Sequence, residues 1–330
     1  MPAIASEHTS KTRNWIRWIG TAISIGLFAW LLARQNWHTV WQNLRSLPLW
    51  VLCLALFMYF LGIVLNALRW HTILHASPIK VPFMEVVKIV FLGSFVSNFL
   101  PSTIGGDAVR IVSLMRYTEE RAVGFTSVVL DRIVNVAAMF TILPFSFVTF
   151  GSPFAVLKSL QSSRTYWMVS SFVFSKGNFP SRIRLKVTDV FHHWRKAFTL
   201  WFRHPWILFL AFVISWFSVF VIFLAIYTLA RGLGIPVALY QVMGVTAITY
   251  LITLLPISVN GYGVREVTMT ALYIYLGATI EQASTLAIVS RFFMLTVTMP
   301  GALWFSRVFT ETLQKKPLAN DHTVEIETHD

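Results

Sequence analysis

The 330-residue sequence has little charge and almost no cysteine. Only 12% of its residues are Asp, Glu, Lys or Arg, whereas 56% are hydrophobic and 15% are aromatic. A water-soluble protein of this length needs more surface charge, so the composition excludes an ordinary soluble domain. The one cysteine, Cys53, lies in an apolar segment, which excludes an intrachain disulfide and a cysteine-based metal cluster. The sequence therefore predicts an all-α, polytopic integral membrane protein of the plasma membrane.

The sequence also lacks the short motifs of several enzyme classes. It contains no Gly-rich phosphate loop with lysine, no serine nucleophile elbow and no zinc-protease helix. His71 and His75 have the spacing of two metal ligands on one helix, but no carboxylate or cysteine completes a site. We therefore expect no metal, no other cofactor and no catalytic residues, and we do not expect an enzyme.

The charge that is present is strongly positive and lies between the apolar segments. The formal net charge is +13 and the isoelectric point is about 10.2. Positive loops of this kind are typical of the cytoplasmic side of a membrane, near anionic headgroups, so we expect no nucleic-acid partner. The richest segments precede residue 15, fill 176–204 and follow residue 305. This distribution predicts cytoplasmic N- and C-termini.

The apolar segments predict a membrane domain at 15–306, with about six full crossings and two interrupted hairpins. A cytoplasmic segment, 1–14, precedes this domain, and a disordered tail, 307–330, follows it. The first crossing, Trp15–Leu32, lacks a small-residue cleavage site, so we expect it to remain in the protein. The other clear crossings are Leu49–Leu68, Ala122–Phe150, Trp206–Ala230 and Gln282–Phe305. The crossing Leu49–Leu68 is followed by Arg69, Trp70 and His71, which we expect to anchor it at the membrane interface.

Two segments of this domain are unusually polar. Residues 153–174 are interrupted by Lys158, Gln161 and Arg164, yet we predict a crossing there. Residues 176–204 have apolar side chains at helical spacing with basic residues between them, which predicts an amphipathic helix on the membrane surface. The alternative is a cytoplasmic helix packed on the protein's own crossings.

Two stretches, Ser97–Arg110 and Thr253–Glu266, carry the same interruption. SNFLPSTIGGDAVR and TLLPISVNGYGVRE each break at Leu-Pro, pass through a Gly-containing polar turn and resume with arginine. Such breaks leave backbone groups that hydrocarbon cannot satisfy, and matching breaks in two halves point to a transporter's substrate site. We predict two re-entrant hairpins related by an internal repeat. Their turn residues are Pro101, Gly105, Gly106, Pro256, Asn260, Gly261 and Gly263.

Seven charged residues lie in or just after these stretches. A charge at the bilayer centre costs about 2.5 to 3.5 kcal/mol, so we expect these residues to pair or to line a shared polar chamber. These seven residues, of which Asp131 is one, have one more positive than negative charge. Such a surplus suits an anionic phosphate headgroup. The predicted headgroup-binding residues are Asp107, Arg110, Arg132, Arg265, Glu266 and Arg291. The alternative is that neighbouring pairs, Asp131 with Arg132 and Arg265 with Glu266, only clamp helices together.

The motifs LPSTIGGDAVR, VVLDRIV at 128–134 and LPISVNGYGVRE resemble the membrane region of lysylphosphatidylglycerol synthases and of their stand-alone flippase-like relatives. The resemblance covers residues 50 to 306, roughly. In the synthases, a cytoplasmic domain transfers an amino acid from aminoacyl-tRNA to phosphatidylglycerol, and we expect that domain to be absent here. The resemblance implies translocation of a phospholipid or polyprenyl-linked lipid.

The expected function is therefore that of a flippase-like protein that binds or translocates a lipid. The expected partners are membrane lipids with an anionic headgroup and, by resemblance, a glycosyltransferase or a lipid-modifying enzyme. One alternative is a membrane-embedded lipid-modifying enzyme that uses the carboxylates as catalysts. The other is a non-transporting scaffold that holds glycosyltransferases on its basic segment.

Overall fold

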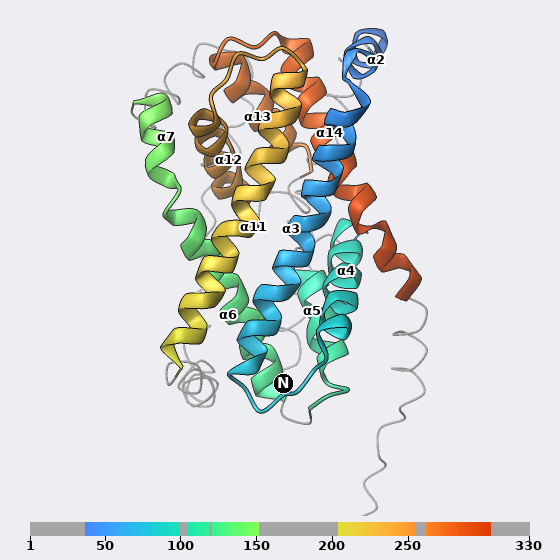
Figure 1. The fold of residues 1–330 in the computed structure, drawn as a ribbon, viewed down its shortest axis with the longest axis vertical. Coiled ribbons are helices and arrows are strands. Elements are labelled where there is room, and N and C mark those ends of the chain that lie inside the picture. The colour runs from blue at the N-terminus through green and yellow to red at the C-terminus, as the bar shows by residue number, and fades with distance from the viewer. Residues whose placement is uncertain (1–36, 100–103, 119–120, 152–203, 255–261, 305–330) are drawn as a thin grey trace, which may run out of the picture.

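The computed structural model describes residues 37–99, 104–118, 121–151, 204–254 and 262–304. Within these ranges all regular secondary structure is helical, and Figure 1 shows the helices packed as an elongated bundle. The all-α prediction is confirmed. Several predicted segments lie outside the described residues: 1–14, the first crossing, 153–174, nearly all of 176–204, and 307–330.

Four helical segments of the described residues are long and apolar enough to cross a membrane. They are Leu49–His75, Ala122–Phe150, Pro205–Gly232 and Ile280–Trp304. The shortest has 25 residues, or about 38 Å at 1.5 Å per residue, which exceeds the roughly 30 Å of a hydrocarbon core. These segments correspond to four of the five crossings predicted after the first one. The protein is a polytopic helical membrane protein.

Helices α3 (Leu49–His75) and α11 (Pro205–Gly232) form the centre of the bundle, where they lie side by side and antiparallel (Figure 1). Each helix starts at a proline, Pro48 before α3 and Pro205 in α11, because proline fits the first turn, where its missing N–H is not needed. Ser218 donates a hydrogen bond of 3.0 Å to the Gly62 carbonyl oxygen across the pair. This bond and the apolar contacts between the two helices fix their register.

The predicted crossing at 122–150 consists of two consecutive helices. Helix α6 covers Arg121–Phe140, and α7 covers Leu143–Phe150 with Pro144 in its first turn. Proline cannot donate to the hydrogen-bond ladder of a preceding helix, so α6 ends before it. Helix α6 packs against α3 and α11, and this contact brings its polar residues into the bundle.

Two pairs of short helices occupy the stretches where hairpins are predicted. Helices α4 (Phe83–Phe99) and α5 (Ile104–Leu114) form one pair, and α12 (Leu239–Leu254) and α13 (Val264–Tyr275) form the other. The longest of the four has 17 residues, about 26 Å, which is less than the hydrocarbon thickness. Figure 1 places the two pairs toward opposite ends of the bundle. The predicted turn residues Pro101, Pro256, Asn260 and Gly261 lie outside the described residues.

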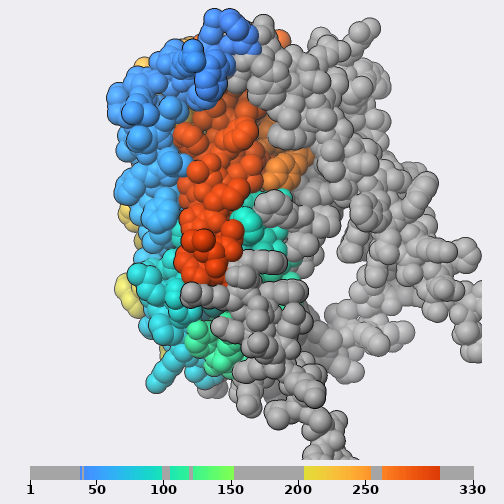
Figure 2. All heavy atoms as spheres, turned by 90° about the vertical axis from the view of Figure 1, so that its right-hand side faces the viewer, coloured from blue at the N-terminus to red at the C-terminus, as the bar shows by residue number. Residues whose placement is uncertain are grey.

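The last long helix, α14 (Ile280–Thr298), closes one side of the bundle. It starts at a capping box, in which the Gln282 backbone N–H donates to Thr279 Oγ1 at 3.2 Å and the Thr279 N–H donates to the Gln282 side chain at 3.1 Å. It packs against α13, α3, α4 and the amphipathic α2 (Trp37–Ser46), and it continues into a short 3-10 turn, η2 (Met299–Gly301). Figure 2 shows its outer face lying between α3 and α4.

Candidate functional site

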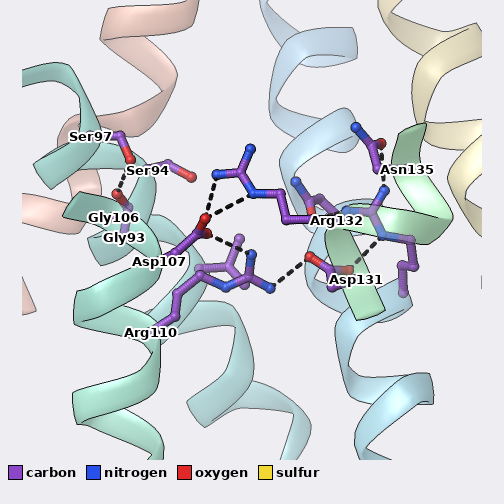
Figure 3. A pocket seen from close by; sticks show the side chains of 12 residues that line it. Gly93, Ser94, Ser97, Gly106, Asp107, Arg110, Asp131, Arg132 and Asn135 are labelled. Atoms are coloured by element: carbon purple, nitrogen blue, oxygen red, sulfur yellow. Dashed lines mark hydrogen bonds and ion pairs between the residues drawn. The ribbon is translucent and has the colours of Figure 1, made fainter. Parts of the chain in front are cut away.

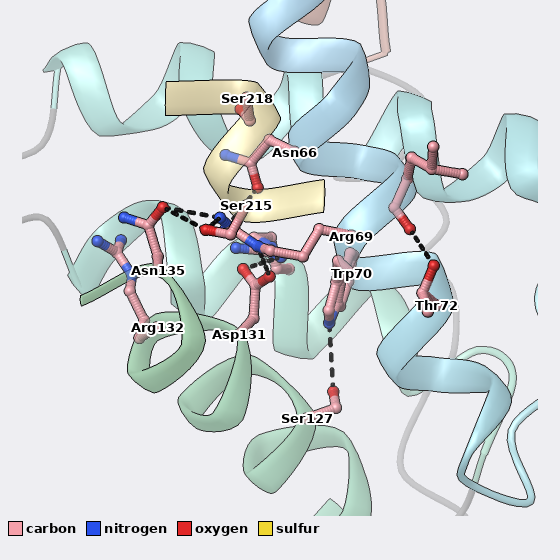
Figure 4. A network of polar contacts seen from close by, with 12 residues as sticks. Asn66, Arg69, Trp70, Thr72, Ser127, Asp131, Arg132, Asn135, Ser215 and Ser218 are labelled. Carbon is pink, nitrogen blue, oxygen red and sulfur yellow. Dashed lines mark hydrogen bonds and ion pairs between the residues drawn. The ribbon is translucent and has the colours of Figure 1, made fainter. Parts of the chain in front are cut away.

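A buried carboxylate, Asp131 on α6, joins three helices. Its Oδ1 accepts a hydrogen bond of 2.7 Å from Arg69 Nε on α3 (Figure 4), and its Oδ2 accepts one of 2.9 Å from Arg110 Nη2 on α5 (Figure 3). Asp131 is 1% exposed, and both arginines are also buried. Charges this deeply desolvated are tolerated only while each keeps its partner. Asp131 therefore connects α3, α5 and α6 inside the bundle.

Neutral side chains satisfy the rest of the Arg69 guanidinium. Its Nη1 donates to Asn135 Oδ1 at 2.7 Å and to Ser215 Oγ at 3.0 Å, and its Nη2 donates to Asn66 Oδ1 at 2.9 Å. The Asn135 amide in turn donates to the Tyr250 hydroxyl at 3.1 Å. This network extends from α3 through α6 and α11 to α12 and holds the guanidinium in place.

The prediction that Arg69 and Trp70 anchor α3 at the membrane interface is wrong, because both side chains are buried. Helix α3 runs on to His75, so these residues lie more than one turn before its end. The Trp70 ring lies under Arg110, with the guanidinium carbon 4.1 Å from the ring centroid, which is a cation–π contact. Trp70 also donates its indole N–H to Ser127 Oγ at 3.4 Å. Arg69 and Trp70 therefore belong to the polar cluster around Asp131 and Arg110, which the sequence did not predict.

Asp107, in the first turn of α5, bridges two arginines at the edge of this cluster. Its Oδ2 lies 2.9 Å from both Nε and Nη2 of Arg132, and its Oδ1 lies 3.7 Å from Arg110 Nη1. The Asp107 side chain is 18% exposed and that of Arg132 is 44% exposed, in contrast to the enclosed Asp131. Asp107 and Arg132 therefore form the open side of the cluster.

A pocket of about 110 Å³ opens beside these charges, lined by residues of α3, α4, α5 and α6 (Figure 3). It is large enough for several water molecules, each of which takes about 30 Å³ of liquid volume. Its lining includes three arginines and two aspartates, so its formal charge is +1. Three of the predicted headgroup-binding residues, Asp107, Arg110 and Arg132, are brought together here. Such a pocket is chemically suited to an anion that accepts several charged hydrogen bonds.

The width of the pocket depends on a close approach of α4 and α5. A Cβ atom on Gly106 would run into the Gly93 carbonyl oxygen and the Ser97 hydroxyl group, so no larger residue fits without moving a helix. A Cβ atom on Gly93 would lie 2.9 Å from Arg110 Cγ. The predicted turn residues Gly105 and Gly106 lie within α5 rather than before it. Gly106 therefore acts as a contact point between helices.

The other three predicted residues, Arg265, Glu266 and Arg291, belong to a separate cluster on α13 and α14. Glu266 is fully buried; its Oε1 accepts from Arg291 Nε at 2.6 Å and its Oε2 accepts from the Gly263 backbone N–H at 2.8 Å. Gly263 precedes the first residue of α13 and has a φ of 76°, a conformation that favours glycine. The Arg291 guanidinium carbon lies 4.4 Å from the centroid of the Tyr262 ring.

This second cluster contains buried polar atoms that have no partner among the described residues. They are Arg291 Nη2 and the hydroxyl groups of Thr270 and Tyr273. Buried groups of this kind are normally satisfied by water or by a ligand. None of Arg265, Glu266 and Arg291 lines the pocket beside Asp107. The expectation of one chamber shared by both hairpins is therefore not met in the part of the chain that the structure describes, which has two separate clusters.

The alternative in which neighbouring residues form the locks is wrong in its pairing. Asp131 bonds to arginines on other helices rather than to Arg132, and Glu266 bonds to Arg291 rather than to Arg265. Consecutive residues on a helix do not face each other, whereas residues on packed helices do. Each of these ion pairs therefore joins different helices.

Comparisons with known proteins agree with the helical membrane fold. A sequence model of the family described as "Lysylphosphatidylglycerol synthase TM region" matches residues 17–301. A "UPF0104 membrane protein" of Pyrococcus horikoshii is 31% identical over 97 residues, which are 28% of this chain and 29% of that relative. The aligned part thus spans less than a third of the relative's length. The chain belongs to the family of the lysylphosphatidylglycerol synthase transmembrane region.

Proposed function

We propose that this protein is a flippase-like lipid transporter. The headgroup of a phospholipid or polyprenyl-linked lipid enters the pocket between α3, α4, α5 and α6, and the lipid then moves between the two leaflets. The observation that carries this proposal is a pocket with an excess of one positive charge, built from helices of a membrane protein. A charged residue inside a bilayer is costly, so such residues usually mark a substrate or ion pathway.

The geometry of Arg110 and Arg132 supports an anionic headgroup as the ligand. Arg132 is partly exposed, whereas Arg110 is fixed by a cation–π contact with Trp70 and a hydrogen bond to Asp131. A fixed guanidinium can give two parallel hydrogen bonds to phosphate oxygens, which lysine cannot do. Ser94 also lines the pocket and adds a hydroxyl group (Figure 3). These groups match the chemistry of a phosphodiester.

The outside of the bundle suits the acyl or prenyl chains of such a lipid. Large apolar side chains such as Phe57 on α3, Phe140 on α6 and Phe217 on α11 are exposed on helices that are long enough to cross the membrane. In a bilayer these faces contact hydrocarbon at no cost. A headgroup can therefore travel along the polar pocket while its chains remain in the lipid.

We propose that the predicted internal repeat is an inverted one, and the second cluster supports this proposal. The pair of short helices α12 and α13 lies toward the end of the bundle opposite to α4 and α5 (Figure 1), and Glu266 on α13 pairs with Arg291 on α14, the helix that follows. Transporters built from inverted repeats expose a central site alternately to the two sides. We propose that both pairs are re-entrant hairpins and that the protein uses them in this way.

Three further expectations belong to this proposal. We propose that the protein resides in the plasma membrane with cytoplasmic N- and C-termini, as the loop charges indicate. We propose lipids with an anionic headgroup as ligands, and, from the resemblance alone, a glycosyltransferase or lipid-modifying enzyme as a protein partner. We assign no catalytic role to the pocket carboxylates, since arginines engage both of them.

The test is transbilayer movement of headgroup-labelled phosphatidylglycerol in proteoliposomes. The wild type should move the lipid faster than protein-free vesicles do, and Arg132→Ala should lower the rate by about 10- to 100-fold, because a charged hydrogen bond contributes roughly 1.5 to 3 kcal/mol. Lys88→Ala is the matched control, since it removes an equal charge from an exposed pair on α4 with Glu85.

Wild-type rates equal to those of protein-free vesicles, for both phosphatidylglycerol and a polyprenyl phosphate, would contradict the proposal. So would an Arg132→Ala variant that moves lipid as fast as the wild type does. Formation of a new lipid product in detergent micelles, where no second compartment exists, would instead support the lipid-modifying enzyme.

A further inference from the structure

The two carboxylates of the pocket are held in very different ways. Asp131 is enclosed, and each of its oxygens accepts a short hydrogen bond from a different buried arginine. Asp107 is partly exposed, its bonds go to the half-exposed Arg132, and its distance of 3.7 Å to Arg110 Nη1 is too long for a good hydrogen bond. Ion pairs that water can reach are weak, whereas enclosed pairs are costly to break. Asp131 is thus a fixed counter-ion, and Asp107 is the carboxylate that a ligand can displace.

The position of Asp107 is that of a bound anion. Figure 3 shows its carboxylate lying between the guanidinium groups of Arg110 and Arg132, with one oxygen toward each. The two non-bridging oxygens of a phosphodiester have the same charge-assisted bonding preference toward two guanidinium groups. Arg110 also keeps a buried Nε with no partner among the described residues.

We infer that Asp107 is an internal substitute for the lipid phosphate. The inference rests on the function proposed above. When a headgroup enters, its phosphodiester takes over the hydrogen bonds of Arg132 and approaches Arg110, while the Asp107 side chain turns into the hydrated part of the pocket. Binding is then an exchange of one anion for another, and Asp107 sets how tightly the pocket holds its ligand.

The charges of the pocket define the class of ligand. Three arginines and two aspartates leave one positive charge, so a headgroup with a single negative charge makes the occupied pocket neutral. A pocket inside a bilayer is least costly when its charges balance. The matching class is a phosphodiester lipid with one net negative charge, such as phosphatidylglycerol.

A built-in competitor is useful in a transporter. A transported ligand must bind strongly enough to enter and weakly enough to leave. Three arginines opposed by Asp131 alone would hold a phosphodiester tightly and slow its release into the second leaflet. With Asp107 present, the departing phosphate is replaced at once by a carboxylate that is already next to the arginines, so neither guanidinium is left without a partner.

The experiment measures binding of short-chain phosphatidylglycerol to the purified full-length protein in detergent by isothermal titration calorimetry. Asp107→Asn should bind the lipid about tenfold more tightly than the wild type, a change of 1.4 kcal/mol, since one competing negative charge is gone. Asp107→Glu keeps the competitor and should bind like the wild type. Glu85→Gln removes a carboxylate from the exposed pair on α4 and should leave the affinity unchanged. In proteoliposomes at saturating lipid, Asp107→Asn should also turn over more slowly.

Equal or weaker binding by Asp107→Asn would overturn the inference. Asp107→Ser is a second neutral variant with the same expected result, and a size-exclusion profile checks that both variants fold. Failure of both to fold would also overturn it, because Asp107 would then be a fixed counter-ion like Asp131. If the wild type binds neither phosphatidylglycerol nor a polyprenyl phosphate, the proposed function itself fails; if it binds lipid but the variant binds no tighter, only the role of Asp107 fails.

Discussion

Glu266 and Arg291 bond at 2.6 Å and are 25 residues apart in the sequence, which is also the separation of Asp107 and Arg132. In both pairs the carboxylate lies in the first turn of a short helix, α13 or α5, and the arginine lies on the long helix that follows. The pairs differ in burial: Glu266 and Arg291 are enclosed, whereas Asp107 and Arg132 face the pocket. The same carboxylate–arginine pair thus occurs twice in the chain, once buried and once open to the pocket.

The closed pair predicts a large loss of stability when it is broken. Glu266→Gln leaves the buried Arg291 without its counter-ion, so we expect a loss of about 3 to 5 kcal/mol. Thermal unfolding in detergent measures this as a clear drop in melting temperature. Glu281→Gln, at an exposed position in the first turn of α14, removes the same charge and should leave the melting temperature nearly unchanged. Similar melting temperatures for Glu266→Gln and the wild type would show that the pair is not a lock.

The contact between α4 and α5 predicts an effect of a single methyl group. Gly106→Ala should destabilise the protein by about 1 to 3 kcal/mol and slow lipid movement, because α5 must shift and carry Asp107 and Arg110 with it. Gly124→Ala on α6 is the matched control, since its added Cβ would lie 3.4 Å from a Leu114 methyl group. We expect this control to be neutral or slightly stabilising, as alanine favours a helix over glycine. Equal behaviour of the two variants would remove the close approach as an explanation of the pocket's width.

The ring under Arg110 predicts a change in lipid affinity. Trp70→Phe weakens the cation–π contact and removes the indole N–H that bonds to Ser127, so Arg110 should be held less firmly. We expect phosphatidylglycerol to bind about three- to tenfold more weakly, measured by calorimetry below the variant's melting temperature. Trp216→Phe, at a tryptophan that stacks on Phe220 of α11, controls for a general loss of packing. A wild-type affinity in Trp70→Phe would show that the ring does not position the guanidinium.

Four of the crossings could be predicted because long apolar segments have few alternatives in a membrane protein. The role of Arg69 could not be predicted in the same way. It follows a run of about 20 apolar residues and precedes Trp70, a pattern typical of an interfacial anchor. Its main partner, Asp131, is 62 residues away in the sequence. One usable signal was Asn66, which lies three residues before Arg69 and so on the same face of α3.

The sequence predicts which charged residues of the two interrupted stretches matter, but it does not predict which residue each of them bonds to. Their clustering follows from the cost of isolated charges in hydrocarbon, which holds for any fold. The choice of Arg291 by Glu266 depends instead on how α13 packs on α14. In the same way, the role of Gly106 depends on the backbone of α4, and a Gly-Gly sequence alone suggests a turn rather than a helix contact.

The proposed site for the lipid headgroup lies between Arg110 and Arg132. The most direct measurement is a cryo-electron microscopy map of the protein in phosphatidylglycerol nanodiscs, with a bound Fab fragment to add mass. We predict phosphate density in the pocket within hydrogen-bond distance of Arg132, with the Asp107 side chain moved away from it. A map in which lipids lie only on the outer faces of α3, α6 and α11, with Asp107 still bonded to Arg132, would show that the pocket does not bind the headgroup.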